Sequence, residues 1–316
     1  MGSLYLYVWN KMSIKKIAIT TGGGDAPGLN AVIRAVTLAG IKRGWECCGI
    51  RCGFDGVLHP EDFPEGGLIP LSTNSVRGIA HTGGTILGTT NRGNPFSYEI
   101  TKEDGSTEKI DISDRLTSSF KEAGIDALVA IGGDGTMGIA HQVSQLGIRV
   151  VGVPKTIDND LKGTIATFGF DTAVSFATEA IGRLHSTASA HQRVMIVEVM
   201  GRHAGWIALH AGVAGSADVV LIPEIPFDIE KIVEKVEQRN AAKRNFTIIC
   251  VAEGASPKGG ESKWVETGGI KKLGGVGEFV AQQLRDKVEN QVRVVCLLYT
   301  SPSPRDRTRS RMPSSA

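Results

Sequence analysis

Apolar runs alternate with amphipathic stretches along nearly the whole chain of 316 residues. Residues 17–20 form a short apolar run that leads into a glycine turn, and residues 29–43 have the apolar spacing of a helix. This order recurs, and it predicts parallel sheets with helices on both faces, which is an α/β fold. The strands expected are 17–20, 45–50, 126–131, 150–153, 192–199, 217–222, 246–252 and 292–295; the helices are 29–43, 113–124, 170–188, 229–243 and 276–288, with two more ending near 146 and 214, and a charged hairpin or insertion is expected at 102–109.

The composition narrows the class of protein. With 41% hydrophobic and 22% charged residues the chain can bury a large core, and its length suggests one large or two medium domains. Its five cysteines include no Cys-x-x-Cys pair, which argues against a disulfide framework or a zinc site and for a reducing cytosol. No apolar run is long enough to span a membrane, and residues 1–11 lack the pattern of a signal peptide, so a cytoplasmic protein without a membrane partner is expected.

The formal charge of +2 is unevenly distributed along the chain. Residues 296–316 carry four arginines and one aspartate, +3, so the rest of the chain has a charge of 2 − 3 = −1. A nearly neutral body does not suggest binding to nucleic acid. The last residues are rich in Ser, Pro and Arg, so 296–316 is expected to be disordered, and the abrupt change indicates a frame shift or foreign sequence.

Two glycine-rich turns follow predicted strands. In the first, residues 22–28, glycines would let the backbone approach phosphates at a helix start, although a tight structural turn explains the pattern equally well. It is neither a Walker A loop nor a dinucleotide fingerprint. The second, residues 132–136, places Asp134 between glycines, where its carboxylate would hold Mg²⁺ or, alternatively, cap the helix. Arg92 lies in a third glycine-containing loop and is either a phosphate ligand or a solvated side chain.

The stretch 154–160, PKTIDND, places Asp158 and Asp160 directly after an apolar run. Ligands of an open α/β sheet bind beyond the carboxyl ends of the strands, where a carboxylate in reach can take a proton from a substrate hydroxyl. The simpler alternative is an acidic turn without chemistry. Arg202 follows another strand and stands at a helix start, which predicts an anion site. Together with the glycine turns, it favours the functional interpretation of Asp158.

Four motifs, in this order, closely resemble the 6-phosphofructokinase family: GGDAPGLN at 23–30, GGDGT at 132–136, PKTIDND at 154–160 and EVMGR at 198–202. The second is a weak indicator alone, because lipid kinases and NAD kinases carry a similar GGDG, and neither of these explains the third motif. The resemblance covers about residues 15–295. It implies two doubly wound parallel-sheet domains with the active site in the cleft between them. The domains expected are a nucleotide-binding domain at 15–168 and a sugar-phosphate-binding domain at 169–295, after an extension at 1–14 and before the tail at 296–316.

The resemblance implies transfer of a phosphoryl group from ATP, with Mg²⁺, to the 1-hydroxyl of fructose 6-phosphate in glycolysis. Asp158 and Arg202 match the catalytic residues, Asp158 as general base, and Asp134 matches the magnesium ligand. The matches to the donor site are Gly23, Arg92, Gly133, Asp134, Gly135 and Thr136; the matches to the sugar site are Thr156, Asp158, Asp160, Arg193, Met200, Gly201, Arg202, Glu253 and Arg293. Arg193 and Arg293 match arginines on the 6-phosphate, and Arg193 is expected to reach a neighbouring subunit of a homo-oligomer, either a dimer or a tetramer.

Departures from the bacterial family pattern leave alternatives open. Lys155 replaces the usual glycine and is shared with diphosphate-using relatives. Gly135 indicates the opposite, because it leaves room for ATP where diphosphate-restricted members carry aspartate. The room at Gly135 is taken as decisive, so ATP is the expected donor. Leu38 and His185 replace effector-binding arginines, which puts nucleotide activation in question although Arg34 is kept. A segment of the family that grips the 6-phosphate is replaced by the tail, so the 316-residue chain is expected to be poorly soluble and weakly active. The alternatives are a diphosphate-dependent phosphotransferase and a catalytically impaired nucleotide-binding fragment.

Overall fold

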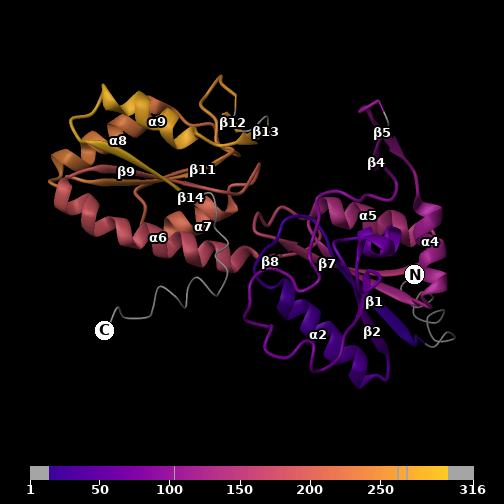
Figure 1. The fold of residues 1–316 in the computed structure, drawn as a ribbon. Coiled ribbons are helices and arrows are strands. Elements are labelled where there is room, and N and C mark those ends of the chain that lie inside the picture. The colour runs from indigo at the N-terminus through magenta and orange to yellow at the C-terminus, as the bar shows by residue number, and fades with distance from the viewer. Residues whose placement is uncertain (1–13, 103, 262, 268–269, 298–316) are drawn as a thin grey trace, which may run out of the picture. The chain divides into compact units, whose positions relative to one another are not determined.

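Figure 1 shows a computed structural model of the chain, which describes residues 14–102, 104–261, 263–267 and 270–297. The chain divides into two compact units on either side of the bond between Lys155 and Thr156. The sequence-based boundary between residues 168 and 169 stays a prediction. Nearly all of the predicted extension at 1–14 and residues 298–316 of the predicted tail lie outside the described residues.

The first unit is built on a mostly parallel sheet. Strand β1 lies between β2 and β6, β6 pairs with β7, and β3 joins β2 in the antiparallel direction. The strands are β1 (Lys16–Thr21), β2 (Glu46–Ile50), β3 (Leu68–Pro70), β6 (Ala127–Gly132) and β7 (Arg149–Thr156). Successive residues of β1 point to opposite faces, so Ile17 and Ile19 enter one core and Ala18 the other.

Helices cover both faces of this sheet. One core contains residues of α2 (Leu29–Lys42), and the other contains residues of α3 (Asp55–Leu58), α4 (Ser113–Glu122) and α5 (Asp134–Gln145). The remaining elements of the unit are the 3-10 turn η2 (Pro60–Asp62) and the antiparallel hairpin of β4 (Tyr98–Thr101) and β5 (Thr107–Ile110), which confirms the hairpin expected near 102–109.

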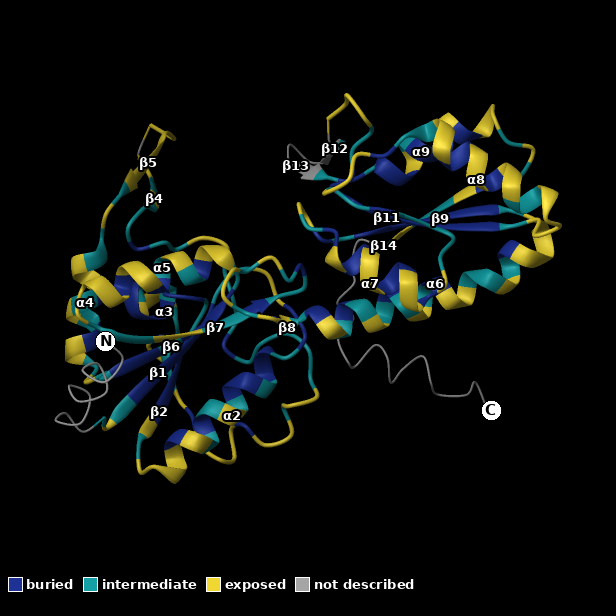
Figure 2. Cartoon of the chain, turned by 180° about the vertical axis from the view of Figure 1, so that it is seen from behind, coloured by how far each residue is buried: buried dark blue, intermediate teal, exposed yellow. Residues whose placement is uncertain are grey.

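The second unit contains a four-stranded parallel sheet in the order β10-β11-β9-β14. Helices α6 and α7 lie against one face and α8 and α9 against the other (Figure 1), and each face has its own apolar core. The strands are dark blue between partly yellow helices in Figure 2, as expected for a doubly covered sheet. The elements are β8 (Phe168–Gly169), α6 (Phe170–His191), β9 (Val194–Val199), α7 (Trp206–Ala214), β10 (Val219–Leu221), α8 (Ile229–Ala241), β11 (Thr247–Ala252), β12 (Trp264–Thr267), β13 (Ile270–Leu273), α9 (Val276–Arg285) and β14 (Val292–Leu297).

The predicted α/β class with parallel sheets covered on both faces is confirmed. One assignment is wrong: Cys296 and Leu297, counted with the disordered tail, continue β14 because they pair with Glu198 and Val199 of β9. The sequence also gave no sign of the short elements β3 and α3 or of the β12–β13 hairpin, which have too few residues to show a period. Among the described helices, none is long and apolar enough to cross a membrane.

The glycine turn that joins β6 to α5 is packed too tightly for side chains. A Cβ atom at Gly132 would lie 2.2 Å from Oγ1 and 2.3 Å from Cβ of Thr136, which is itself buried. We therefore expect Gly132→Ala to lower the free energy of unfolding by about 1–3 kcal/mol, the usual cost of overpacking. Gly138 is the matched control, because a Cβ there meets no atom within 4 Å and Ala favours a helix interior by up to about 1 kcal/mol. Urea unfolding of both variants is the measurement, and equal midpoints would contradict the expectation.

Candidate functional site

In the first unit the two predicted glycine turns lie against each other at the carboxyl ends of adjacent strands. The amide of Gly22, after β1, donates to the carbonyl of Ile131 in β6 at 2.9 Å. A Cβ at Gly22 would lie 2.6 Å from Oγ1 of Thr136. Only glycine permits this approach, which leaves backbone amides of both turns and the start of α5 at one edge of the sheet. Such an edge suits phosphate groups.

The loop that carries Arg92 is bonded to the first of these turns. The amide of Gly23 donates to the carbonyl of Thr90 at 3.0 Å, and the Thr89 hydroxyl donates to the carbonyl of Gly23 at 2.6 Å. The Arg92 amide donates to the Thr90 hydroxyl at 2.9 Å, and the Arg92 side chain is exposed. The structure thus brings Gly23, Arg92 and the run 133–136 together, all from the first unit. A flexible cation beside amide-rich turns can bind a phosphate.

Asp134 is the first residue of α5, and its side chain is exposed. The helix cap is Gly133, and no side chain caps the amides there, so the alternative of Asp134 as N-cap is wrong. Within the described residues no cluster of three or more His, Cys, Asp or Glu could hold a metal by itself. A single exposed carboxylate beside the two glycine turns still fits Mg²⁺, because this ion keeps several water ligands and is bound by one or two carboxylates together with substrate phosphates.

Lys155 links three strands of the first sheet. It is the penultimate residue of β7 with only 4% of its surface exposed, and its ammonium donates to the carbonyl of Gly24 in the turn after β1. Because β6 lies between β1 and β7, the side chain passes over the turn after β6, where Gly133 faces the Lys155 carbonyl. The lysine that the sequence singled out for a possible diphosphate site therefore bonds to the first glycine turn.

In the second unit Asp158 is buried at the start of the chain segment that leaves β7. It is 7% exposed, its Oδ2 accepts from the Thr156 hydroxyl at 3.3 Å, and its Oδ1 has no partner among the described residues. The Thr167 hydroxyl donates to the Thr156 carbonyl at 2.7 Å and holds the segment in place. Burial is the main cause that raises the pKa of Asp158 to about 6, with the Asp160 charge next, while Arg202 acts in the opposite direction.

The loop after β9 presents Arg202 in the same unit. Gly201 has a φ of 145° and Arg202 a φ of 52°, so both depart from ordinary strand geometry, and the guanidinium is exposed. Glu253, at the end of the adjacent strand β11, is buried, and its Oε1 accepts from the amides of Gly201 at 3.2 Å and Arg202 at 2.8 Å. The structure therefore gathers Asp158, Asp160, Arg202 and Glu253 near one another. This set combines a buried carboxylate, Asp158, with an exposed cation, Arg202.

Arg193 and Arg293 lie at the opposite end of the same sheet. Arg193 precedes β9, whereas the Gly201–Arg202 turn follows it, and a strand of six residues spans about 20 Å. Arg293 is paired with Met195 near the start of β9, so it lies at the same end as Arg193. Arg193 donates to Gln291 Oε1 at 2.7 Å. The structure therefore does not bring either arginine to Asp158 within this chain.

Two further glutamates were given no role by the sequence, and both hold backbone amides at helix starts. Glu198 of β9 is buried and accepts from the amides of Gly275 and Gly277, each at 2.8 Å, where α9 begins. Glu224, after β10, accepts from the Gly205 amide at 2.8 Å, where α7 begins. Negative charge is stabilising at these positions. A charged residue in an otherwise apolar strand is the signal that would have identified Glu198.

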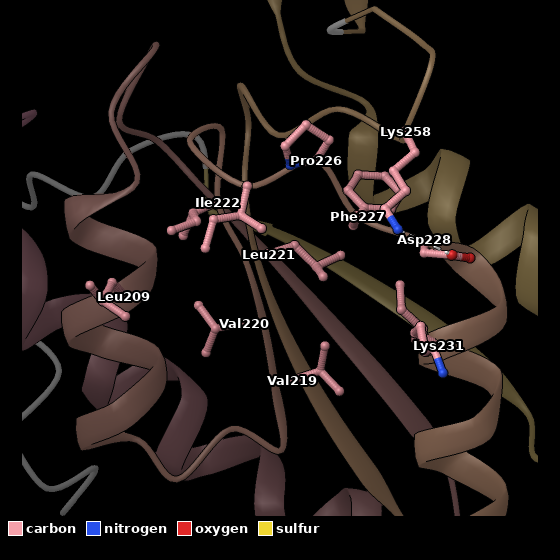
Figure 3. A pocket seen from close by; sticks show the side chains of 12 residues that line it. Leu209, Val219, Val220, Leu221, Ile222, Pro226, Phe227, Asp228, Lys231 and Lys258 are labelled. Carbon is pink, nitrogen blue, oxygen red and sulfur yellow. Dashed lines mark ion pairs between the residues drawn. The ribbon is translucent and has the colours of Figure 1, made fainter.

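An apolar hollow of about 480 Å³ lies elsewhere in the second unit, beside β10 (Figure 3). Its charged residues are Lys231 and the pair Lys258 and Asp228, whose Nζ and Oδ2 atoms are 3.7 Å apart. The apolar lining includes Leu209, Val219, Val220, Leu221, Ile222 and Phe227. None of the predicted site residues lines this hollow, so we do not place the site there.

Known proteins resemble this chain in sequence and in fold. A family description named phosphofructokinase matches residues 16–313. An ATP-dependent 6-phosphofructokinase 2 of Clostridium perfringens is 54% identical over 88% of this chain and 75% of its own length. A pyrophosphate–fructose 6-phosphate 1-phosphotransferase of Amycolatopsis methanolica is 50% identical over 90% of this chain and 80% of its own length. The crystal structure of Pichia pastoris phosphofructokinase superposes with a TM-score of 0.74 at 30% identity, over 91% of this chain and 30% of that one.

Proposed function

Because the chain belongs to the phosphofructokinase family, we propose that it transfers a phosphoryl group from ATP to the 1-hydroxyl of fructose 6-phosphate. The product is fructose 1,6-bisphosphate, and the reaction belongs to glycolysis in the cytoplasm. The observation that carries this proposal is Asp158, a buried carboxylate with one oxygen lacking a partner among the described residues. Such a group is suited to take a proton from an alcohol, since burial raises its pKa to about 6, which is close to neutral pH.

Each unit is assigned its own part of the reaction. Residues of the second unit receive the sugar. Asp158 accepts the proton of the 1-hydroxyl while the oxygen of this hydroxyl attacks the γ-phosphorus of ATP. The ring is oriented by Thr156, Asp160, Met200 and Gly201. Arg202 offsets the negative charge that spreads over the transferred group. Residues of the first unit hold ATP through the amides of Gly23 and 133–136 and through Arg92. ADP leaves with the electrons of the broken P–O bond, and the proton stays on Asp158 until the product departs.

Two features of the first unit favour ATP over diphosphate. A Cβ built on Gly135 meets no atom within 4 Å, so open space remains where diphosphate-restricted relatives carry aspartate. The ammonium of Lys155, the cation that the sequence associates with diphosphate, is engaged by the Gly24 carbonyl. The Amycolatopsis relative keeps diphosphate as the alternative donor.

The test of the proposed function is a side-by-side assay of the full-length protein with ATP and with diphosphate, following fructose 1,6-bisphosphate formation. We expect turnover with ATP and much slower turnover with diphosphate. Turnover with diphosphate alone would contradict ATP as donor but keep the acceptor. Absence of turnover with both, in a folded protein, would favour the impaired fragment.

We further propose that Asp134 is the residue that holds Mg²⁺, together with the phosphates of ATP and water. The ion, when bound, offsets the phosphate charges during transfer. Asp134→Asn is expected to raise the Mg²⁺ concentration needed for half-maximal activity by at least about tenfold, since a hydrogen bond or ligand bond from a charged group is worth about 1.5–3 kcal/mol. Asp25→Asn is the matched control, an exposed aspartate in the first glycine turn that has no proposed role. An unchanged Mg²⁺ response in the Asp134 variant would remove it as the ligand.

The 6-phosphate requires arginines that this chain does not bring to its own Asp158. Arg193 and Arg293 lie at the far end of β9 and β14, so we propose that each serves a site in a neighbouring copy of a homo-oligomer. A second copy is the simplest source of the missing positive charge.

A further inference from the structure

The backbone of Arg202 has a conformation that needs support from its surroundings. Its φ of 52° lies in the left-handed region, which residues with a Cβ rarely adopt and which persists only where neighbouring groups hold it. Gly201, directly before it, has a φ of 145°. The position of the Arg202 guanidinium therefore depends on whatever fixes this turn.

Glu253 is the side chain that fixes the turn. One of its oxygens, Oε1, accepts from the amides of both Gly201 and Arg202, at 3.2 and 2.8 Å. The side chain is 6% exposed, and its own amide donates to the Val199 carbonyl at 2.9 Å, which fixes the base of the side chain to β9. Among the described residues no lysine, arginine or histidine forms an ion pair with Glu253, so backbone amides compensate its charge.

The turn is also closed from the side of β11. A Cβ at Gly254, the residue after Glu253, would lie 2.1 Å from the Arg202 carbonyl oxygen. The ends of β9 and β11 thus approach as closely as a glycine permits, and they are in register, since Ala252 pairs with Val199. We therefore expect a change at Glu253 to displace the backbone of Arg202.

Glu253 also acts on Asp158. The charged groups that face Asp158 are Asp160 and Glu253, which raise its pKa, and Arg202, which lowers it, and the Thr156 hydroxyl is bonded to it. Loss of the Glu253 charge should therefore leave Asp158 ionised at a lower pH.

We propose that Glu253 is a positioning residue for phosphoryl transfer, which holds the Gly201–Arg202 turn through its carboxylate and sets the charge beside Asp158. The proposal rests on the roles proposed above for Asp158 and Arg202, and it goes beyond the sugar contact that resemblance implies for Glu253. The two functions of the carboxylate, as acceptor and as charge, are separable by substitution.

Glu253→Gln keeps an oxygen that can accept from both amides but removes the charge. At pH 8, where Asp158 is ionised in both enzymes, kcat should stay within about fivefold of the parent. The acid limb of the kcat/KM profile should move to lower pH, because the Glu253 charge raises the pKa of Asp158. The phosphate of fructose 6-phosphate titrates in the same range, but identically for both enzymes, so the difference between them reports on the protein.

Glu253→Ala removes the acceptor as well, and we expect kcat to fall by about 10²-fold, the effect of misplacing a reacting group by about 1 Å. Glu224→Gln is the matched control. Glu224 also accepts a backbone amide at a strand end, from Gly205, but it does not act on Asp158, so neither kcat nor the acid limb should change. Circular dichroism confirms folding, and if Glu253→Ala does not fold, the glutamine variant decides alone.

The proposal is overturned if Glu253→Gln raises the KM for fructose 6-phosphate by tenfold or more while its acid limb coincides with that of the parent. That result would make Glu253 a direct sugar ligand only. It is also overturned if the acid limb moves equally in the Glu224 control. Failure of the underlying function is distinguishable, because Asp158→Asn would then keep its kcat whatever the Glu253 variants do.

Discussion

Replacing Asp158 by asparagine is expected to lower kcat by about 10²–10⁴-fold, the usual contribution of general acid–base catalysis. Asparagine has nearly the same shape and can accept from the Thr156 hydroxyl, but it cannot take a proton from the substrate. Binding of ATP and of fructose 6-phosphate, measured by calorimetry, should change much less than kcat. A variant with near-normal kcat would show that Asp158 has only a structural role.

The same substitution is expected to stabilise the fold at neutral pH. Burial raises the pKa of Asp158 from 3.8 to about 6 in the folded protein, so folding favours the protonated carboxyl. The contribution of this group to stability is therefore fully present below pH 3.8 and is lost as the pH rises through about 6. At pH 7.5 the ionised carboxylate costs about 3 kcal/mol, a cost that asparagine avoids.

Urea unfolding at two pH values tests this expectation. The variant should exceed the parent in stability at pH 7.5, and the gain should shrink toward zero as the pH approaches 4. The parent's kcat should also fall as the pH decreases through about 6, because the base is then protonated. A gain of equal size at both pH values would contradict the titration of Asp158 as its cause.

Mixing the impaired variants Arg193→Ala and Asp158→Asn is expected to restore activity at limiting fructose 6-phosphate if Arg193 serves a neighbouring subunit. Arg193→Ala alone should weaken fructose 6-phosphate binding by roughly 10–150-fold, because a hydrogen bond to a charged group contributes about 1.5–3 kcal/mol. In a mixed oligomer, a site can combine Asp158 of the Arg193→Ala chain with Arg193 of the Asp158→Asn chain. After equal mixing and subunit exchange, about a quarter of the sites should be intact.

The control for this experiment uses Arg202, which lies with Asp158 in the same unit and is one of the charges that act on it. Asp158→Asn mixed with Arg202→Ala should stay inactive, because no site can obtain both residues from different chains. Recovery is measured at limiting fructose 6-phosphate after confirming exchange by mass spectrometry of the mixed oligomers. If the Arg193 mixture stays as inactive as its components, the neighbouring-subunit role is wrong, and Arg293→Ala should be tested in the same way.

The fold was largely predictable because most of its strands and helices are long enough to show the spacing of their apolar residues. Residues 194–197 and 248–252 are continuous apolar runs, as expected for strands of a doubly covered parallel sheet, and α6 has enough turns to show its apolar stripe. The end of β14 was missed for a physical reason. Its register is set by β9, not by the composition of the residues that follow it.

The candidate site was predictable as a set of residues but not as a geometry. Asp158, Arg202 and Asp134 stand out because charged residues follow apolar strands. The sequence did not show how the side chains around these residues are bonded. Lys155 donates to the carbonyl of Gly24, 131 positions away, and Glu253 accepts from the backbone amides of Gly201 and Arg202. Contacts of this kind depend on strand order, because β6 must lie between β1 and β7 before the lysine can cross it.

The buried contact between Glu198 and the start of α9 has a consequence for the history of the family. A Cβ at Gly277 would lie 2.9 Å from Oε2 of Glu198 and 3.2 Å from Val294, so a larger residue at 277 requires a shorter one at 198. Conversely, a chain that loses the Glu198 carboxylate leaves the amides of Gly275 and Gly277 without this acceptor. It also removes the atoms that crowd a side chain at position 277. Positions 198 and 277 are therefore expected to change together during evolution, and statistical coupling between them should be stronger than between either position and Gly275, whose φ of 79° requires glycine for its own sake.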